Sequence, residues 1–118
     1  MAKFDKIAVL NKIGSTGMVP VFYHKDAEVA KKVVKACYDG GVRAFEFTNR
    51  GDFAQEVFAE IVKFAAKECP EMAIGIGSIV DPATAAMYLQ KGEYLEVYDR
   101  QFDGRNRRYY KVTESGRI

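Results

Sequence analysis

Apolar and polar positions alternate along the chain in blocks that predict helices and strands in turn. Residues 3–13 repeat apolar side chains at roughly helical spacing, which predicts a short leading helix that ends near Gly14. Residues 18–23 form a continuous apolar run that is typical of a buried strand. Pro20 is unusual inside such a run and indicates either the start of the strand or a position without a ladder hydrogen bond.

The next blocks repeat this alternation with clear start and stop signals. Asp26 is a suitable N-cap for a helix whose apolar positions recur every three and four residues, and the glycine pair 40–41 ends that helix. The apolar run 42–48 predicts a second strand. Residues 51–52 then open a long amphipathic helix, which Pro70 stops.

The pattern changes character near residue 92. Before that point, residues 72–79 predict a third strand, and Asp81 caps a helix over residues 83–91. Beyond it, residues 94–102 and 107–113 alternate apolar and polar side chains around an Asp-Gly turn, which is a strong signal of an antiparallel hairpin.

The order of these elements predicts an α/β fold. A leading helix followed by three strand–helix units favours parallel strands joined by right-handed crossovers, in the order 1-2-3 if each helix returns to the same face. We expect one domain over residues 1–118, with the C-terminal hairpin added at one edge of the sheet and covering part of it. A closed barrel of this kind needs eight strands and about 250 residues, so three strands form at most a fragment of one.

Composition adds few constraints. The 118 residues are 48% hydrophobic, which is enough for a core, and a net charge of +2 is too small to indicate a nucleic-acid or membrane partner by itself. Cys37 and Cys69 are isolated and His24 is the single histidine, so we expect no metal site, no cofactor and a reducing, cytoplasmic setting. We also expect neither a membrane span nor a secretory signal.

Candidate chemistry lies in the stretch 40–51. Glu46, Thr48 and Arg50 occupy alternate positions, so on a strand they would share one face near its C-terminal end. Ligands of parallel α/β proteins bind at that end. The alternative is structural: Glu46 forms an ion pair with Arg50 or Arg43 and has no further role.

Three segments carry a resemblance to a known enzyme family. The segments are Val19-Pro20-Val21, the run from Gly40 to Arg50, and Gly75-Ile76-Gly77-Ser78-Ile79-Val80. Residues 1 to about 90 resemble the N-terminal part of the 2-keto-3-deoxy-6-phosphogluconate (KDPG) aldolases, class I pyruvate aldolases with a (β/α)₈ barrel. The resemblance implies that residues 1–91 form a (β/α)₃ fragment of a TIM barrel with lyase ancestry.

The aldolase resemblance also implies roles for single residues. Glu46 would be the proton shuttle, while Arg50 and Ser78, with Thr48 beside them, would hold the carboxylate of pyruvate. The family's Schiff-base lysine and phosphate-binding turn lie on later strands, and this sequence has no segment that matches them. No lysine falls inside a strand beside Glu46 in the first three strands.

The C-terminal segment has a different resemblance. Residues 89–95 and 103–117, with the run Arg-Arg-Tyr-Tyr-Lys-Val-Thr-Glu-Ser-Gly, resemble the wing of the winged-helix domain in PadR-like transcriptional regulators. The resemblance implies that residues 92–118 form a wing hairpin whose basic residues contact DNA phosphates weakly and without sequence choice. The candidate contacts are Arg105, Arg107, Arg108 and Lys111. The alternative is a solvated strand face whose arginines pair with Asp99 and Asp103.

Taken together, the two resemblances predict a chimeric or designed (de novo) protein with no evolved activity, whose Glu46, Thr48, Arg50 and Ser78 are vestigial. Two alternatives stay open: residual pyruvate-type class I aldolase activity, and weak non-specific DNA binding through the hairpin. Open sheet edges favour a homo-oligomer, with a dimer as the first expectation.

Overall fold

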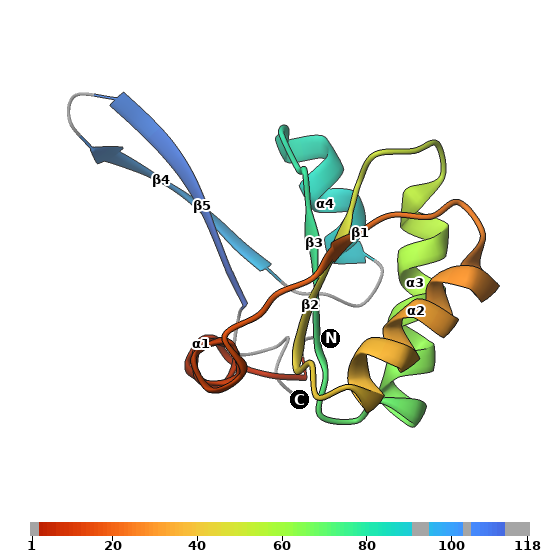
Figure 1. Ribbon diagram of the computed structural model, residues 1–118. Helices are drawn as coiled ribbons and strands as arrows, with labels where there is room; N and C mark the ends of the chain where they lie inside the picture. Colours follow the sequence, from red (N-terminus) through yellow and green to blue (C-terminus); the bar gives the residue numbers. More distant parts are fainter. Residues whose placement is uncertain (1–2, 91–94, 103–104, 113–118) are drawn as a thin grey trace.

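The computed structural model describes residues 3–90, 95–102 and 105–112. Its elements in chain order are α1 (Lys6–Thr16), β1 (Val21–Phe22), α2 (Ala27–Asp39), β2 (Ala44–Thr48), α3 (Ala54–Glu68), β3 (Ala73–Gly77), α4 (Pro82–Gln90), β4 (Leu95–Phe102) and β5 (Arg105–Val112) (Figure 1). This is an α/β fold consistent with part of a (β/α) barrel, as the sequence predicted.

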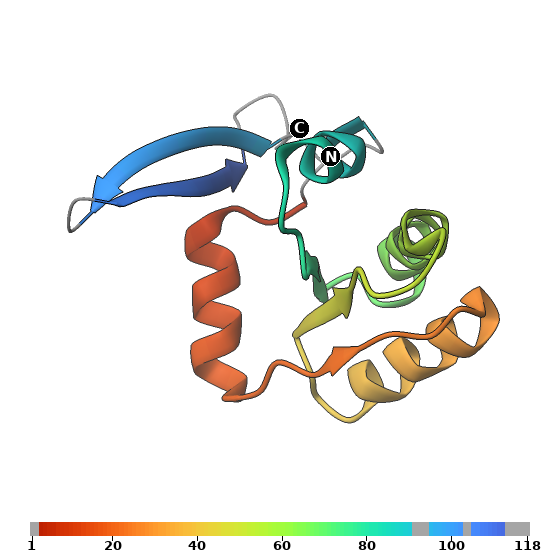
Figure 2. The ribbon, with the colours of Figure 1, turned by 90° about the horizontal axis from the view of Figure 1, so that it is seen from above.

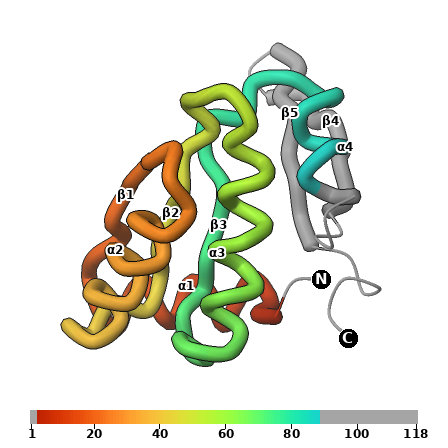
Figure 3. The backbone as a smooth tube through the Cα atoms, turned by 90° about the vertical axis from the view of Figure 1, so that its right-hand side faces the viewer, coloured from red at the N-terminus to blue at the C-terminus, as the bar shows by residue number. Residues whose placement is uncertain are grey.

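The three-stranded sheet has the order β1-β2-β3, and both pairings are parallel. Strand–helix–strand crossovers with α2 and α3 produce this order, which the sequence predicted. The two helices lie side by side on one face of the sheet (Figure 3). Helix α1 lies on the opposite face, so that face is only partly covered (Figure 2).

The core lies between the sheet and the helices α2 and α3. Phe45 and Phe47 are fully buried, because alternate residues of β2 point toward the helices. Phe47 lies 6.3 Å from Phe58 of α3, and Phe58 in turn meets Tyr88 of α4 edge-on at 5.5 Å between ring centroids. Each such ring contributes about 1.5–3 kcal/mol by burial, so this aromatic row joins α4 to the body of the fold.

Two helix boundaries differ from the sequence prediction. Helix α1 does not end near Gly14. It continues to Thr16, where Gly17 adopts φ 67° and its N–H donates to the carbonyl of Ile13 at 2.8 Å. Gly17 can take the left-handed conformation that ends a helix, and this decides the boundary.

Helix α3 begins later than residues 51–52. Its N-cap is Phe53 at φ 59°, and no side chain caps the helix. A phenylalanine is rare in that conformation, so sequence rules based on capping residues could not place this start. The β1 strand is also shorter than the apolar run 18–23, and begins directly after Pro20.

The hairpin forms a sheet of its own. Strands β4 and β5 pair antiparallel from Leu95↔Val112 to Phe102↔Arg105. Among the described residues, neither strand pairs with the three-stranded sheet, so the expected addition at a sheet edge is wrong. A tight turn satisfies hairpin pairing locally, whereas joining a sheet edge requires a partner strand that the sequence pattern does not identify.

Candidate functional site

Glu46 occupies the middle of β2 on the face that α1 leaves partly open. It pairs in register with Val21 of β1 and with Gly75 of β3. Its carboxyl group lies over the next glycine of β3: a Cβ on Gly77 would come within 2.5 Å of Glu46 Oε2 and 2.8 Å of Oε1. The carboxylate is therefore held against bare backbone, in space that only glycine leaves free.

The other predicted site residues lie at the same C-terminal end of the strands but differ in setting. Thr48 is buried, and its Oγ1 lies 3.5 Å from the carbonyl of Phe22. Arg50 is exposed and lies beyond β2, where its N–H donates to the carbonyl of Thr48 at 3.0 Å. The prediction that Arg50 continues the strand face with Glu46 is therefore wrong, because β2 ends at Thr48 and the chain turns.

Ser78 follows β3 directly and is exposed. Its φ of 62° lies in the left-handed region, which a non-glycine residue adopts rarely and which accompanies functional sites more often than chance. Glu46, Arg50 and Ser78 thus come from two adjacent strands and the turns that follow them. Their types, a carboxylate, a guanidinium and a hydroxyl, suit a small carboxylate ligand.

The purely structural interpretation of Glu46 fails for Arg43. That guanidinium donates to the carbonyls of Tyr38 and Val42 at 2.9 and 2.8 Å, stacks 4.2 Å from the Tyr38 ring, and pairs with Glu71 at 3.5 Å. It fixes the turn between α2 and β2. Among the described side chains, Glu46 has no ion pair within 4.0 Å, with Arg50 or any other residue.

A polar link beside the site was not predicted from the sequence. The hydroxyl of Tyr88 donates to Asn49 Oδ1 at 2.9 Å, and the Asn49 N–H donates to the carbonyl of Gly77 at 3.0 Å. Burial raises the pKa of Tyr88, so the phenol stays protonated as a donor. Asn49 thus joins β2, β3 and α4 directly before Arg50. A buried tyrosine needs a partner, but the sequence gives no sign of which one.

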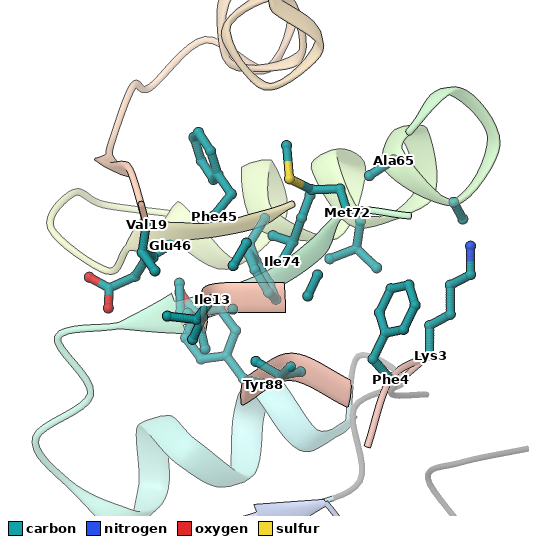
Figure 4. A pocket seen from close by; sticks show the side chains of 18 residues that line it. Lys3, Phe4, Ile13, Val19, Phe45, Glu46, Ala65, Met72, Ile74 and Tyr88 are labelled. Carbon is teal, nitrogen blue, oxygen red and sulfur yellow. The ribbon is translucent and has the colours of Figure 1, made fainter. Parts of the chain in front are cut away.

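A cavity of about 450 Å³ opens next to Glu46. Its walls are mostly apolar and come from α1, α3, β2, β3, Val19 and Tyr88 (Figure 4). Lys3 and Glu46 lie at opposite ends of it, and the Lys3 ammonium donates to the carbonyl of Pro70. No lysine therefore pairs with Glu46 among the described residues.

The hairpin candidates are placed only by the backbone. The register sets Asp99 opposite Arg108, Glu96 opposite Lys111, and Arg100 opposite Arg107. The side chains of Arg105, Arg107, Arg108 and Lys111 lie outside the described part of the structure, as does Asp103.

Metal-binding clusters and membrane-spanning helices are both absent from the described residues. In residues 3–90, 95–102 and 105–112, no group of three or more histidine, cysteine, aspartate or glutamate side chains could hold a metal ion. Within those same ranges, every helix is too short or too polar to cross a bilayer.

Comparison with known proteins identifies the body of the chain. The family model for KDPG and KHG aldolase matches residues 9–95. The curated KHG/KDPG aldolases of Escherichia coli strain K12, E. coli O157:H7 and Shigella flexneri are each 35% identical over 80 residues. That alignment covers 68% of this chain and 36% of each relative, so the chain spans about a third of the length of the relatives that it matches.

These matches correct the functional expectation drawn from the sequence. An enzyme family accounts for residues 9–95, which overturns the interpretation as a chimeric or designed protein without evolved activity. The family match also extends past residue 92, where the sequence pattern changes. The resemblance of the hairpin to a PadR-like wing is not shown by these comparisons. Residues 9–95 make up most of the chain, and the chain belongs to the KDPG and KHG aldolase family.

Proposed function

We propose that this chain carries the acid–base part of a pyruvate-type aldolase, with Glu46 as the group that transfers the proton. One observation carries the proposal: a half-buried carboxylate, without an ion pair among the described residues, is held against Gly77 on the open face of a parallel sheet. Carboxylates so placed serve as general bases. Family membership supports the same chemistry.

The proposed step is enolisation of a bound 2-oxo acid such as pyruvate. A Glu46 carboxylate oxygen accepts a proton from the methyl carbon, the C–H bond breaks, and its electron pair forms the enolate. Arg50 and Ser78, at the ends of β2 and β3, bind the substrate carboxylate, while Thr48 shapes the floor of the site. The imine-forming lysine of a class I aldolase belongs to a later strand in the resemblance, so the proposal is limited to proton transfer.

Exchange of the pyruvate methyl protons with deuterium tests this step directly, because it needs no aldehyde partner. Proton NMR in D₂O should show exchange that is faster with protein than without, and Glu46→Gln should abolish the difference. Glu68→Gln is the matched control, because Glu68 is an exposed carboxylate at the end of α3. Equal exchange by wild type and Glu46→Gln would refute the assignment.

Borohydride trapping with pyruvate, followed by intact mass and peptide mapping, tests separately for an imine. A trapped adduct would identify the reactive lysine and extend the proposal to a class I mechanism. Without an adduct, Glu46-dependent exchange would still support the proton-transfer role.

The hairpin supports a second, weaker candidate, namely non-specific binding of DNA phosphates. Strand β5 places basic residues at positions 105, 107, 108 and 111, but two of them lie opposite Asp99 and Glu96 in the register. Acidic neighbours reduce the net charge of the strand, so affinity should be low and should fall with added salt. Sequence-selective retention of one duplex over a scrambled one at physiological salt would contradict this assignment.

A further inference from the structure

The cavity beside Glu46 extends across the sheet to the outer edge of β3. Val19, residues 44–46 of β2, and residues 73–76 of β3 with the preceding Met72 all line it. Phe58 and Val62 of α3 form one wall, and Val9 and Ile13 of α1 contribute to another. Because α3 and α1 lie on opposite faces of the sheet, the part of the cavity between them passes around the outer edge of β3, and we call that part the edge slot.

The edge slot carries unpaired backbone groups. Ala73 donates its N–H to the carbonyl of Arg43 at 2.9 Å, and Gly77 accepts from Asn49, so alternate residues of β3 point their backbone groups toward β2. Ile74 and Ile76 therefore point theirs into the slot. Among the described residues, no strand lies on this side of β3. An apolar small molecule would leave these donors and acceptors without partners, whereas an extended strand would satisfy them.

The opposite edge of the same sheet offers such a strand. The carbonyl of Pro20 accepts from the Glu46 N–H at 2.9 Å, so Pro20 faces β2, and Val19 and Val21 point their backbone groups outward. Proline has no backbone N–H, but at position 20 that group would point toward β2. Its absence therefore removes no hydrogen-bond donor from the outer edge of β1. The side chains here are apolar, and Met18 and Val21 are 57% and 58% exposed, while Val19 is 38% exposed and also lines the cavity of its own copy.

We propose that the edge slot of one copy binds residues 18–22 of a second copy of this chain as an added parallel strand. The strand order then continues as β1-β2-β3-β1-β2-β3 across the two copies, with every strand in the same direction. The contact is head-to-tail, since each copy presents an acceptor edge at β3 and a donor edge at β1. The exposed apolar side chains of the donor edge would be buried in the apolar edge slot of the acceptor, while the backbone groups of the two edges form hydrogen bonds.

Single substitutions can block each edge separately in the full-length protein. Gly75→Lys places a positive charge at the edge slot, which should prevent a second strand from pairing there. The monomer should tolerate this substitution, because a Cβ at position 75 meets no atom within 4 Å and position 75 pairs in register with the acidic Glu46. Gly75→Val occupies the same position without charge and should preserve association. Val21→Lys blocks the donor edge at an exposed side chain, and Val80→Lys is its control, at an apolar residue that is 92% exposed and lies on neither edge.

Sedimentation velocity across a wide range of protein concentration measures the result, with circular dichroism to confirm that each variant is folded. Wild type, Gly75→Val and Val80→Lys should sediment with masses that rise above the monomer as concentration increases. Gly75→Lys and Val21→Lys should each remain monomeric. An equal mixture of those two should form a dimer that grows no further, because one supplies an intact donor edge and the other an intact acceptor edge.

The mixing experiment separates this arrangement from others. A wild type that stays monomeric at every concentration would overturn the proposal, as would association that survives both lysine substitutions. In a symmetric dimer both copies use the same surface, so every interface in the mixture would contain a blocking lysine and the mixture would stay monomeric. That result would also overturn the head-to-tail contact.

Discussion

At the residue scale, strand periodicity predicted the face of β2 that carries Glu46, but not the contacts that surround its carboxyl. Alternation along β2 correctly placed Glu46 opposite the buried Phe45 and Phe47, since that depends on strand periodicity alone. Gly75 and Gly77 lie on the same face of β3, yet only Gly77 is approached closely, by the Glu46 carboxyl. Which of two glycines is needed depends on a contact between strands, and local sequence patterns do not contain that information.

The two glycines give a matched test of the Glu46 position. Gly77→Ala places a methyl group in the space of the Glu46 carboxyl, which must move, so pyruvate methyl exchange should fall on the order of 10- to 100-fold, the scale expected for misplacement by about 1 Å. Gly75→Ala adds the same methyl group to open space and should lose far less. Equal losses in the two variants would show that the carboxyl is not held against Gly77.

The two cysteines should differ in reactivity. Cys69 is buried and burial raises the pKa of its thiol, while Cys37 is only partly buried. Because the thiolate is the nucleophile, native protein at pH 8 should react with a disulfide reagent at one thiol quickly and at the other only after unfolding. Cys37→Ser should remove the fast phase and Cys69→Ser should keep it. If Cys69→Ser removed the fast phase instead, Cys69 would have to be exposed at the surface.

At the element scale, helix ends were predictable where a side chain makes the cap. Asp26 and Asp81 were both expected as N-caps: Asp26 accepts from the Glu28 N–H at 2.8 Å, and Asp81 accepts from the Thr84 N–H at 2.8 Å. Boundaries set by backbone conformation were missed, at Gly17 and at Phe53. Capping side chains leave a sequence signal, whereas left-handed backbone at a phenylalanine is imposed by tertiary packing.

The Asp81 cap should make stability depend on pH in a defined window. Hydrogen bonds from the Thr84 backbone and hydroxyl lower the pKa of Asp81 in the folded protein. A lowered folded pKa stabilises the fold fully above the unfolded value of about 3.9, and this contribution is lost as pH falls through the folded pKa. Asp81→Ala should therefore lower the melting temperature by a few degrees at pH 7, and the difference from wild type should shrink as pH falls below about 4.

Asp81→Asn is the matched control for this cap. Its amide oxygen still accepts from the Thr84 N–H but carries no charge, so the loss at pH 7 should be smaller than for Asp81→Ala. Because neither variant has a carboxylate at position 81, the difference between Asp81→Asn and Asp81→Ala should not vary with pH. A constant difference between Asp81→Ala and wild type from pH 7 to pH 3 would show that the carboxylate charge does not contribute.

At the scale of the whole molecule, the order of elements predicted the parallel sheet correctly, because short right-handed crossovers allow few alternatives. Placement of the hairpin was wrong, because nothing in its alternation specifies a partner strand. The functional expectation was wrong for a related reason: the change of pattern near residue 92 was interpreted as a junction between unrelated proteins, yet the aldolase family match runs from residue 9 to 95.

The separation of the two sheets leads to a prediction about truncation. The buried cluster runs from Ala30 to Tyr88 and holds the aromatic row Phe47, Phe58 and Tyr88, all within residues 1–92. Strands β4 and β5 pair only with each other among the described residues. Residues 1–92 alone should therefore unfold cooperatively, with a melting temperature within a few degrees of the full chain, when measured in dilute solution to limit self-association.

The complementary fragment, residues 93–118, should show no cooperative transition, because an isolated two-stranded hairpin is at best marginally stable in water. Thermal unfolding followed by circular dichroism and calorimetry compares both fragments with the full chain. An aggregated or molten 1–92 fragment, with loss of near-ultraviolet signal and broad unfolding, would mean that the hairpin supplies apolar cover that a three-stranded sheet with two open edges needs. A cooperative transition that is unchanged by the truncation would instead establish residues 1–92 as an independently folding aldolase-family unit, in which Glu46 and the edge slot can be studied without the hairpin.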